Sequence, residues 1–404
     1  MADGGPEPRV SPWLAAAFCG AAVATVPIGF TLPAGAYLAL GTLGIIAVLA
    51  ARVESPKRWR GVRVWPVAMI LGSIAASAAA GPDPAQSVAR FATMPLFALL
   101  FPAAQVAAWR AGALRLVFAA GAVALLAMAV DFTVNAGPIA GSLGNANDAA
   151  AAAMLVPLAA AALPALPTPL GSRLMAAAVA LVPVARSGSR QALLALLITV
   201  AQPALTRMTW RRGIGMLAVA IAITAAAVAI SPRLSGKLAT TVDKGLGYRA
   251  TLVAFGLTHL QEAPFLGHGP GLFGRSHAAG VQDGWSWRGQ ALKPIGMPWV
   301  HCLPLEIAFE LGAVGVITFS AVGFATVRRI RRRQGRPPSA LPGQATSVAA
   351  AMLAAFAVVG LVDLTLLKDW VRCLLWLAAG LAFAGPGPAD NRTDSSGKAV
   401  AETA

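Results

Sequence analysis

The residues best suited to chemistry in this 404-residue chain stand at the borders of long apolar runs. His301 opens one such run and is followed by Glu306 and Glu310. A neutral imidazole at a membrane–water boundary can take a proton from an attacking hydroxyl near neutral pH, although a histidine there can also be incidental. The two glutamates lie one helical turn apart, and carboxylates facing lipid are costly. We therefore expect them to line a polar interior or to pair with basic residues.

Two arginines, Arg186 and Arg190, flank a Ser-Gly-Ser turn between two apolar runs. Arginines at a membrane rim can extend to lipid headgroups. A pair at the start of a helix also suits a phosphate, because the helix N-terminus and the guanidinium forks both attract an anion. The sequence leaves both interpretations open.

A third polar segment, residues 141–148, precedes another apolar run and contains Asn145, Asn147 and Asp148. Asp148 or Asn147 could cap the helix that follows. Asn145 and Asn147 could instead hydrogen-bond a sugar or a phosphate.

The fourth segment lies in the long polar stretch 232–299. Tyr248 and Arg249 begin a largely apolar helix that could rest on the membrane surface or on the helix bundle. The turn at residues 264–271 that follows is rich in glycine and proline, and we expect it to be structural. His268 within this turn is either a ligand contact or a loop residue.

These segments are positioned by about twelve apolar runs, most of which approach the roughly 20 residues that cross a bilayer. The chain is 57% hydrophobic and only 12% charged, which argues against a large soluble helical core. The predicted runs are residues 12–31, 35–51, 64–81, 87–108, 112–130, 149–166, 174–185, 191–206, 213–231, 300–327, 346–366 and 370–386.

Basic residues gather in the connectors 52–63, 207–212 and 328–336, which is typical of cytoplasmic loops. The net charge of +16 therefore reflects membrane topology, and we expect no nucleic-acid partner. Both termini are predicted to be cytoplasmic, and all four candidate segments then share the outer face. The predicted outer segments are residues 82–86, 131–148, 186–190 and 232–299.

The predicted fold is an all-α, polytopic membrane protein. Membrane helices occupy residues 1–231 and 300–386, and one large outer loop with short helices occupies residues 232–299. The tail, residues 387–404, is predicted to be disordered and cytoplasmic.

In their order along the chain, the four segments resemble the O-antigen ligase and O-antigen polymerase superfamily of bacterial envelope glycosyltransferases. The family has a histidine, a polar residue, nine further residues and Gly-x-x-Gly. Here the pattern is His301, Cys302 and the glycines Gly312 and Gly315. Cys302 departs from the asparagine, serine or glutamine that is usual at its position.

Three other segments are similar to the family. Residues 189–194 resemble its Ser-Arg-x-x-Leu-Leu helix start, and residues 141–147 resemble its glycine- and asparagine-rich segment. Residues 247–249 and 264–271 resemble the core of its outer loop.

The resemblance implies glycan transfer at the periplasmic face of a bacterial inner membrane, without a cofactor. The donor would be a glycan on undecaprenyl diphosphate, held among membrane lipids. The acceptor would be a sugar hydroxyl of lipid A-core in a ligase, or another lipid-linked repeat unit in a polymerase. We favour the ligase.

The leaving group of this reaction is a diphosphate, whose growing charge suits permanently charged, bidentate arginines. This role falls to Arg190 and Arg249. His301 would be the general base toward the acceptor, or would orient the diphosphate. The chain has no Asp-x-Asp sequence, so we expect direct, inverting displacement without a metal. The substrate-binding candidates are Arg186, Asn145, Asn147, Tyr248 and His268.

Two other classes of function are the alternatives. A secondary transporter also has about twelve helices, but its polar residues would lie near the midplane in matching halves. A non-catalytic component of envelope assembly would tolerate the replacement of His301 by alanine.

Overall fold

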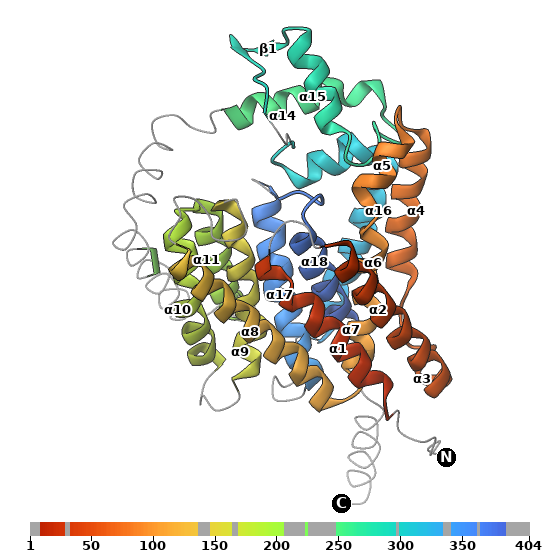
Figure 1. The fold of residues 1–404 in the computed structure, drawn as a ribbon, viewed down its shortest axis with the longest axis vertical. Coiled ribbons are helices and arrows are strands. Elements are labelled where there is room, and N and C mark those ends of the chain that lie inside the picture. Colours follow the sequence, from red (N-terminus) through yellow and green to blue (C-terminus); the bar gives the residue numbers. More distant parts are fainter. Residues whose placement is uncertain are drawn as a thin grey trace, which may run out of the picture.

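The computed structural model describes residues 9–28, 33–135, 146–163, 169–205, 223–224, 248–295, 299–333, 341–361 and 364–384. These residues form a bundle of helices with a small outer layer at one end (Figure 1). The helices are α1 (Ser11–Ala24), α2 (Ala34–Glu54), α3 (Pro56–Trp59), α4 (Trp65–Ala80), α5 (Pro84–Phe91), α6 (Met94–Ala98), α7 (Leu100–Ala107), α8 (Ala111–Val134), α9 (Ala150–Ala162), α10 (Pro169–Ser187), α11 (Arg190–Leu205), α14 (Tyr248–His259), α15 (Phe273–Gln282), α16 (Leu303–Arg333), α17 (Leu341–Gly360) and α18 (Asp369–Phe383). The short 3-10 helices are η1 (Val26–Ile28), η3 (Ala146–Ala149) and η4 (Leu260–Glu262).

The described part of each predicted apolar run is mainly helical, although the run 87–108 is divided among α5, α6 and α7. The run 213–231 lies outside the described residues apart from 223 and 224. In the described part of the chain, five helices are long and apolar enough to cross a membrane. They become six if the bent pair Pro84–Phe91 and Met94–Ala107 is one span. The all-α membrane architecture is thus confirmed, apart from a hairpin of β1 (Ser286–Trp287) and β2 (Gln290–Ala291). The number of twelve crossings remains a prediction, as does the predicted tail 387–404, which lies outside the described residues.

The bundle is apolar on its outer surface as well as in its core. On the peripheral helices α2 and α16, Leu38, Val53, Ile317 and Phe324 are 67% to 79% exposed. The central helices α9 and α18 are rich in alanine and almost completely buried. Small residues let helix backbones approach closely, and apolar side chains that face outward suit a lipid environment.

The basic connectors lie at one end of the bundle as far as they are described, which is residues 52–63 and 328–333. At this end the backbone N–H of Ser11 donates to Glu54 (3.0 Å), which joins the start of α1 to the end of α2. Arg329 donates to the carbonyl of Phe383 (3.2 Å), and the Trp65 ring packs edge-on against the Phe383 ring. The starts of α1 and α4 therefore share one end with the ends of α2, α16 and α18. The elements α14, α15 and β1, which belong to the predicted outer loop, lie at the opposite end (Figure 1).

Helix α16 is broken at Gly312, and the glycine-rich turn of the outer loop fills the break. Gly312 has a φ of 62° and a ψ of −160°. The N–H groups of His268 and Gly269 donate to the carbonyls of Phe309 and Glu310 (2.9 and 3.0 Å) at the end of the first helical part.

The second part of α16 is satisfied in the same way. The N–H groups of Ala313 and Val314 donate to the carbonyls of Pro264 and Phe265 (2.8 and 3.1 Å). A broken membrane helix is tolerated when protein groups satisfy the freed backbone. The turn at residues 264–271 is therefore structural, as expected, and it fixes the outer loop to the helix that begins just after His301.

A second break separates α5 from α6. The helix pair bends by 43° between Phe91 and Met94, where the sequence predicted one continuous run. Pro95 lies in the first turn of α6, where a residue without an N–H group ends one helix and begins another. The break exposes the carbonyl of Arg90 and the hydroxyl of Thr93 to partners from α18.

Candidate functional site

The turn before α11 is built to hold the start of that helix. Gly188 has a φ of 62°, and the hydroxyl of Ser189 accepts a hydrogen bond from the N–H of Ala192 (3.3 Å), which caps α11. The same hydroxyl donates to the amide oxygen of Asn147 (3.3 Å). Arg190 is the first residue of α11 and is half-buried. The turn thus joins Asn147 to the helix start that carries Arg190.

Asp148, the neighbour of Asn147, forms a buried ion pair with Lys368. The ammonium group of Lys368 and the indole N–H of Trp370 (3.1 Å) both donate to Asp148 Oδ1. The side chains of Lys368 and Asp148 are only 2% and 1% exposed. The N-cap position of α9 is occupied by Ala149, without a side-chain cap, so the cap that the sequence allowed for Asp148 or Asn147 is not formed. A buried carboxylate needs a charged partner, and Lys368 supplies it.

Lys368 also contacts the segment that carries His301. Its ammonium lies 5.1 Å from the centre of the Trp299 ring, which is a cation–π contact. The rings of Trp299 and His301 are 4.8 Å apart. Three of the four predicted segments are therefore connected through Asp148, Lys368 and Trp299.

His301 is held in a strained conformation directly before α16. Its φ of 59° lies in the left-handed region, which non-glycine residues adopt rarely. Backbone strain of this kind, when the surrounding protein imposes it, often occurs at functional sites. Two residues later α16 begins, and the N–H of Glu306 donates to the carbonyl of Cys302 (2.8 Å).

Two further predicted residues, Arg186 and Arg249, lie outside this cluster. Arg186 donates through Nε to the carbonyl of Phe132 (3.2 Å) and so links α10 to the end of α8. Arg249 is the second residue of α14 and is half-buried. Asn145 lies outside the described residues.

Tyr248 and His268 have partners within the outer loop. The hydroxyl of Tyr248 accepts from the N–H of Lys293 (2.7 Å) and lies 3.3 Å from Nε2 of His277. Burial lowers the pKa of His277 below its usual value. His268 stacks on the Phe309 ring, and its Nε2 lies 3.0 Å from the carbonyl of His259. These contacts favour a structural role for Tyr248 and His268, although substrate binding by them stays a prediction.

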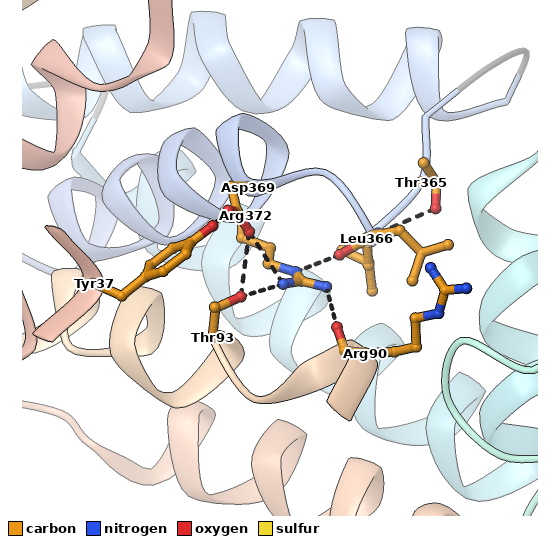
Figure 2. A network of polar contacts seen from close by, with 8 residues as sticks. Tyr37, Arg90, Thr93, Thr365, Leu366, Asp369 and Arg372 are labelled. Carbon is orange, nitrogen blue, oxygen red and sulfur yellow. Dashed lines mark hydrogen bonds and ion pairs between the residues drawn. The ribbon is translucent and has the colours of Figure 1, made fainter. Parts of the chain in front are cut away.

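A buried polar network supports the cluster from α18 (Figure 2). The guanidinium of Arg372 donates to the carbonyls of Leu366 (2.5 Å) and Arg90 (3.0 Å) and to the hydroxyl of Thr93 (2.5 Å). It also pairs with Asp369 (3.2 Å). Arg372 therefore ties the break between α5 and α6 to the connection that carries Lys368.

Glu306 and Glu310 line this interior, in agreement with the expectation from the sequence. Glu306 accepts from the hydroxyl of Thr365 (2.8 Å) and from the N–H of Leu366 (2.9 Å). The carboxyl group of Glu310 accepts from the N–H groups of Gly271 and Phe273 in the outer loop. Both glutamates are at most 3% exposed, so they hold the loop and the α17–α18 connection against α16.

Sequence reasoning missed Lys368, Trp299 and Arg372. The signal was present on the predicted outer side, because Lys368 separates two apolar runs and Arg372 interrupts the second of them. Intramembrane cations of this kind usually mark a function or a buried partner. Asp148 lies 220 residues from Lys368 and Arg90 lies 282 residues from Arg372, so no local pattern identifies these two pairings.

Comparison with known proteins finds one match. Residues 175–320 match the model of a protein family described as O-antigen ligase. The matched range contains Arg190, Arg249 and His301, and it ends before Lys368. No curated protein matches the chain.

Proposed function

We propose that the chain, whose residues 175–320 match the family model described as O-antigen ligase, transfers a glycan from undecaprenyl diphosphate to a sugar hydroxyl. The acceptor is lipid A-core, on the periplasmic face of the inner membrane, and both termini are cytoplasmic. The observation that carries the proposal is the connection of the Arg190 helix start, through Asp148 and Lys368, to the strained His301.

The donor's diphosphate suits the cationic side of this cluster. The first N–H groups of α11 and the guanidinium of Arg190 attract an anion at one place. Arg249 approaches the same diphosphate from the outer loop. Positive groups held in place before the reaction stabilise the charge that grows on the leaving oxygen.

The acceptor hydroxyl attacks the anomeric carbon of the donor sugar as the bond to the diphosphate oxygen breaks. His301 accepts the proton of the hydroxyl, and the electron pair of the broken bond leaves with the diphosphate. Direct displacement inverts the configuration at the sugar carbon. The step requires no metal, so activity that depends on a divalent cation after chelation would contradict this part of the proposal.

Variants of His301 and Arg190 test the site. His301→Ala and Arg190→Gln, expressed at normal levels in a deletion strain, should lose glycan attachment on gels of lipopolysaccharide. His259→Ala is a matched control, because His259 stacks on Phe255 in the same outer loop outside the cluster. Unchanged surface glycan in His301→Ala would indicate a non-catalytic assembly component.

The family covers polymerases as well as ligases, and the deletion strain separates the two. Loss of a ligase leaves polymerised glycan on its lipid carrier and bare core on the gel. Loss of a polymerase instead gives core with a single repeat unit, which would replace the ligase assignment by the polymerase one.

A further inference from the structure

The outer loop and α5 line an open cavity that the proposed reaction does not use. Its volume is about 880 Å³, which falls within the range of roughly 300–1,000 Å³ for ligand sites. Leu367 forms part of the wall and directly precedes Lys368 in the chain. The cavity therefore borders the Lys368 cluster.

The lining of this cavity is positively charged. Arg90 from α5 and Arg275 from α15 both line it, and no acidic residue is among the described residues that do. Arg275 is neutralised by Asp83 (2.8 Å), the N-cap residue of α5. Within the described parts of the chain, no carboxylate lies within ion-pair distance of Arg90, so its charge is left for a ligand.

Arg90 is held in position by the network below it. Its carbonyl accepts from Arg372 (3.0 Å), and its side-chain stem lies against Gly271. The guanidinium points away from the network, toward the outer loop (Figure 2). A fixed backbone and a packed stem reduce the entropy that the side chain loses when an anion binds.

The other lining residues suit a sugar chain better than an inorganic ion. Gln86 and Gln282 offer amide donors and acceptors for hydroxyl groups, and the buried His277 offers an imidazole edge. Leu367 and Val281 add apolar surface on which a sugar ring can rest.

We infer that this cavity binds an anionic saccharide, meaning a sugar chain that carries a carboxylate or a phosphate, with Arg90 as its main charged contact. The inference rests on the proposed glycan transfer, because the saccharide is part of the acceptor or of the donor glycan. Leu367 then places the bound chain beside the reacting groups.

Binding to the full chain in nanodiscs of zwitterionic lipid tests the inference without turnover. The probes are trigalacturonate and, as a neutral counterpart, maltotriose. The wild type should bind trigalacturonate at least about tenfold more tightly, and Arg90→Gln should lose about tenfold or more of that affinity. Arg288→Gln, which removes an exposed charge from the same outer loop, is the matched control and should bind like the wild type.

Arg90→Lys keeps the charge and should keep the preference for the anion, which separates binding from a folding defect. Equal binding of the two probes by the wild type, no saturable binding, or undiminished affinity in Arg90→Gln would each overturn the inference.

Transfer kinetics then identify the source of the saccharide. In Arg90→Gln the KM for the acceptor rises if the acceptor occupies the cavity, and the KM for the donor rises if the donor glycan does. Both KM values unchanged would overturn the assignment to a substrate. A wild type without any transfer would contradict the proposed function while leaving the binding measurement intact.

Discussion

Replacing Gly267 with alanine should detach the outer loop from the break in α16. A Cβ at this position would lie 2.3 Å from the carbonyl carbon of Glu310, and ordinary contact begins at 3.4 Å. Because backbone atoms cannot rotate aside, the turn must retreat by about 1 Å. The four hydrogen bonds between the turn and α16, now 2.8 to 3.1 Å long, would then exceed hydrogen-bond length.

The expected cost follows from these contacts. Four lost hydrogen bonds at about 0.5–1.5 kcal/mol each give roughly 2–6 kcal/mol. The positive φ of 71° adds about 1–2 kcal/mol for any residue with a Cβ. Gly284 is the matched control, because its φ is 67° but nothing lies within 4 Å of a Cβ there. Gly284→Ala should therefore cost only the conformational part.

Hydrogen exchange and thermal unfolding of the two variants in nanodiscs measure the difference. Gly267→Ala should speed exchange of the amides of His268, Gly269, Ala313 and Val314, and should lower the unfolding midpoint more than Gly284→Ala does. Equal exchange and equal midpoints in the two variants would refute the reasoning, since the contact with Glu310 would then carry no energy.

Two further predictions concern buried groups near the cluster. Lys368→Met removes the ammonium group from the buried carboxylate of Asp148, which costs roughly 3–5 kcal/mol. The unfolding midpoint of this variant should fall well below that of Lys293→Met, which replaces an exposed lysine. Adding Asp148→Asn to Lys368→Met should restore part of the lost stability. Equal midpoints for the two lysine variants would count against the buried pair. Burial lowers the pKa of His277 below 6.5, because the folded protein favours the neutral imidazole. The stability that this neutral ring contributes is therefore complete above pH 6.5 and is lost as the pH falls through the folded-state pKa. Exchange in α15, corrected for its intrinsic pH dependence, should increase on acidification in the wild type but not in His277→Gln, and a pH-independent wild type would contradict this.

The sequence predicted the helices and their order because hydrophobicity is a local property. It did not predict the two breaks. Residues 300–327 form one apolar run, so the left-handed conformation of Gly312 depends on the turn that fills the break. Pro95 was a local signal for the other break. The sequence alone, however, does not distinguish a proline in the first turn of a new helix from a proline that kinks one continuous helix.

The candidate site was predicted in its parts but not in its connections. Arg190 and His301 were identifiable by residue type and by their place at the ends of apolar runs. Their connection passes through Asp148 and Lys368, whose pairing spans 220 residues of chain. Because a buried charge pairs with a group that is close in three dimensions and not in sequence, the local pattern suggested only a possible helix cap for Asp148 or Asn147.

The place of α18 in the chain has a consequence for membrane insertion. Lys368, Asp369 and Arg372 join groups on α2, the α5–α6 break, η3 and α16, all of which are synthesised earlier. Until α18 enters the bilayer, the carboxyl group of Glu306 and the hydroxyl of Thr93 lack these partners. Assembly of the polar interior is therefore completed late in biogenesis, and a chain that ended before α18 would leave these buried polar groups without the partners that α18 supplies.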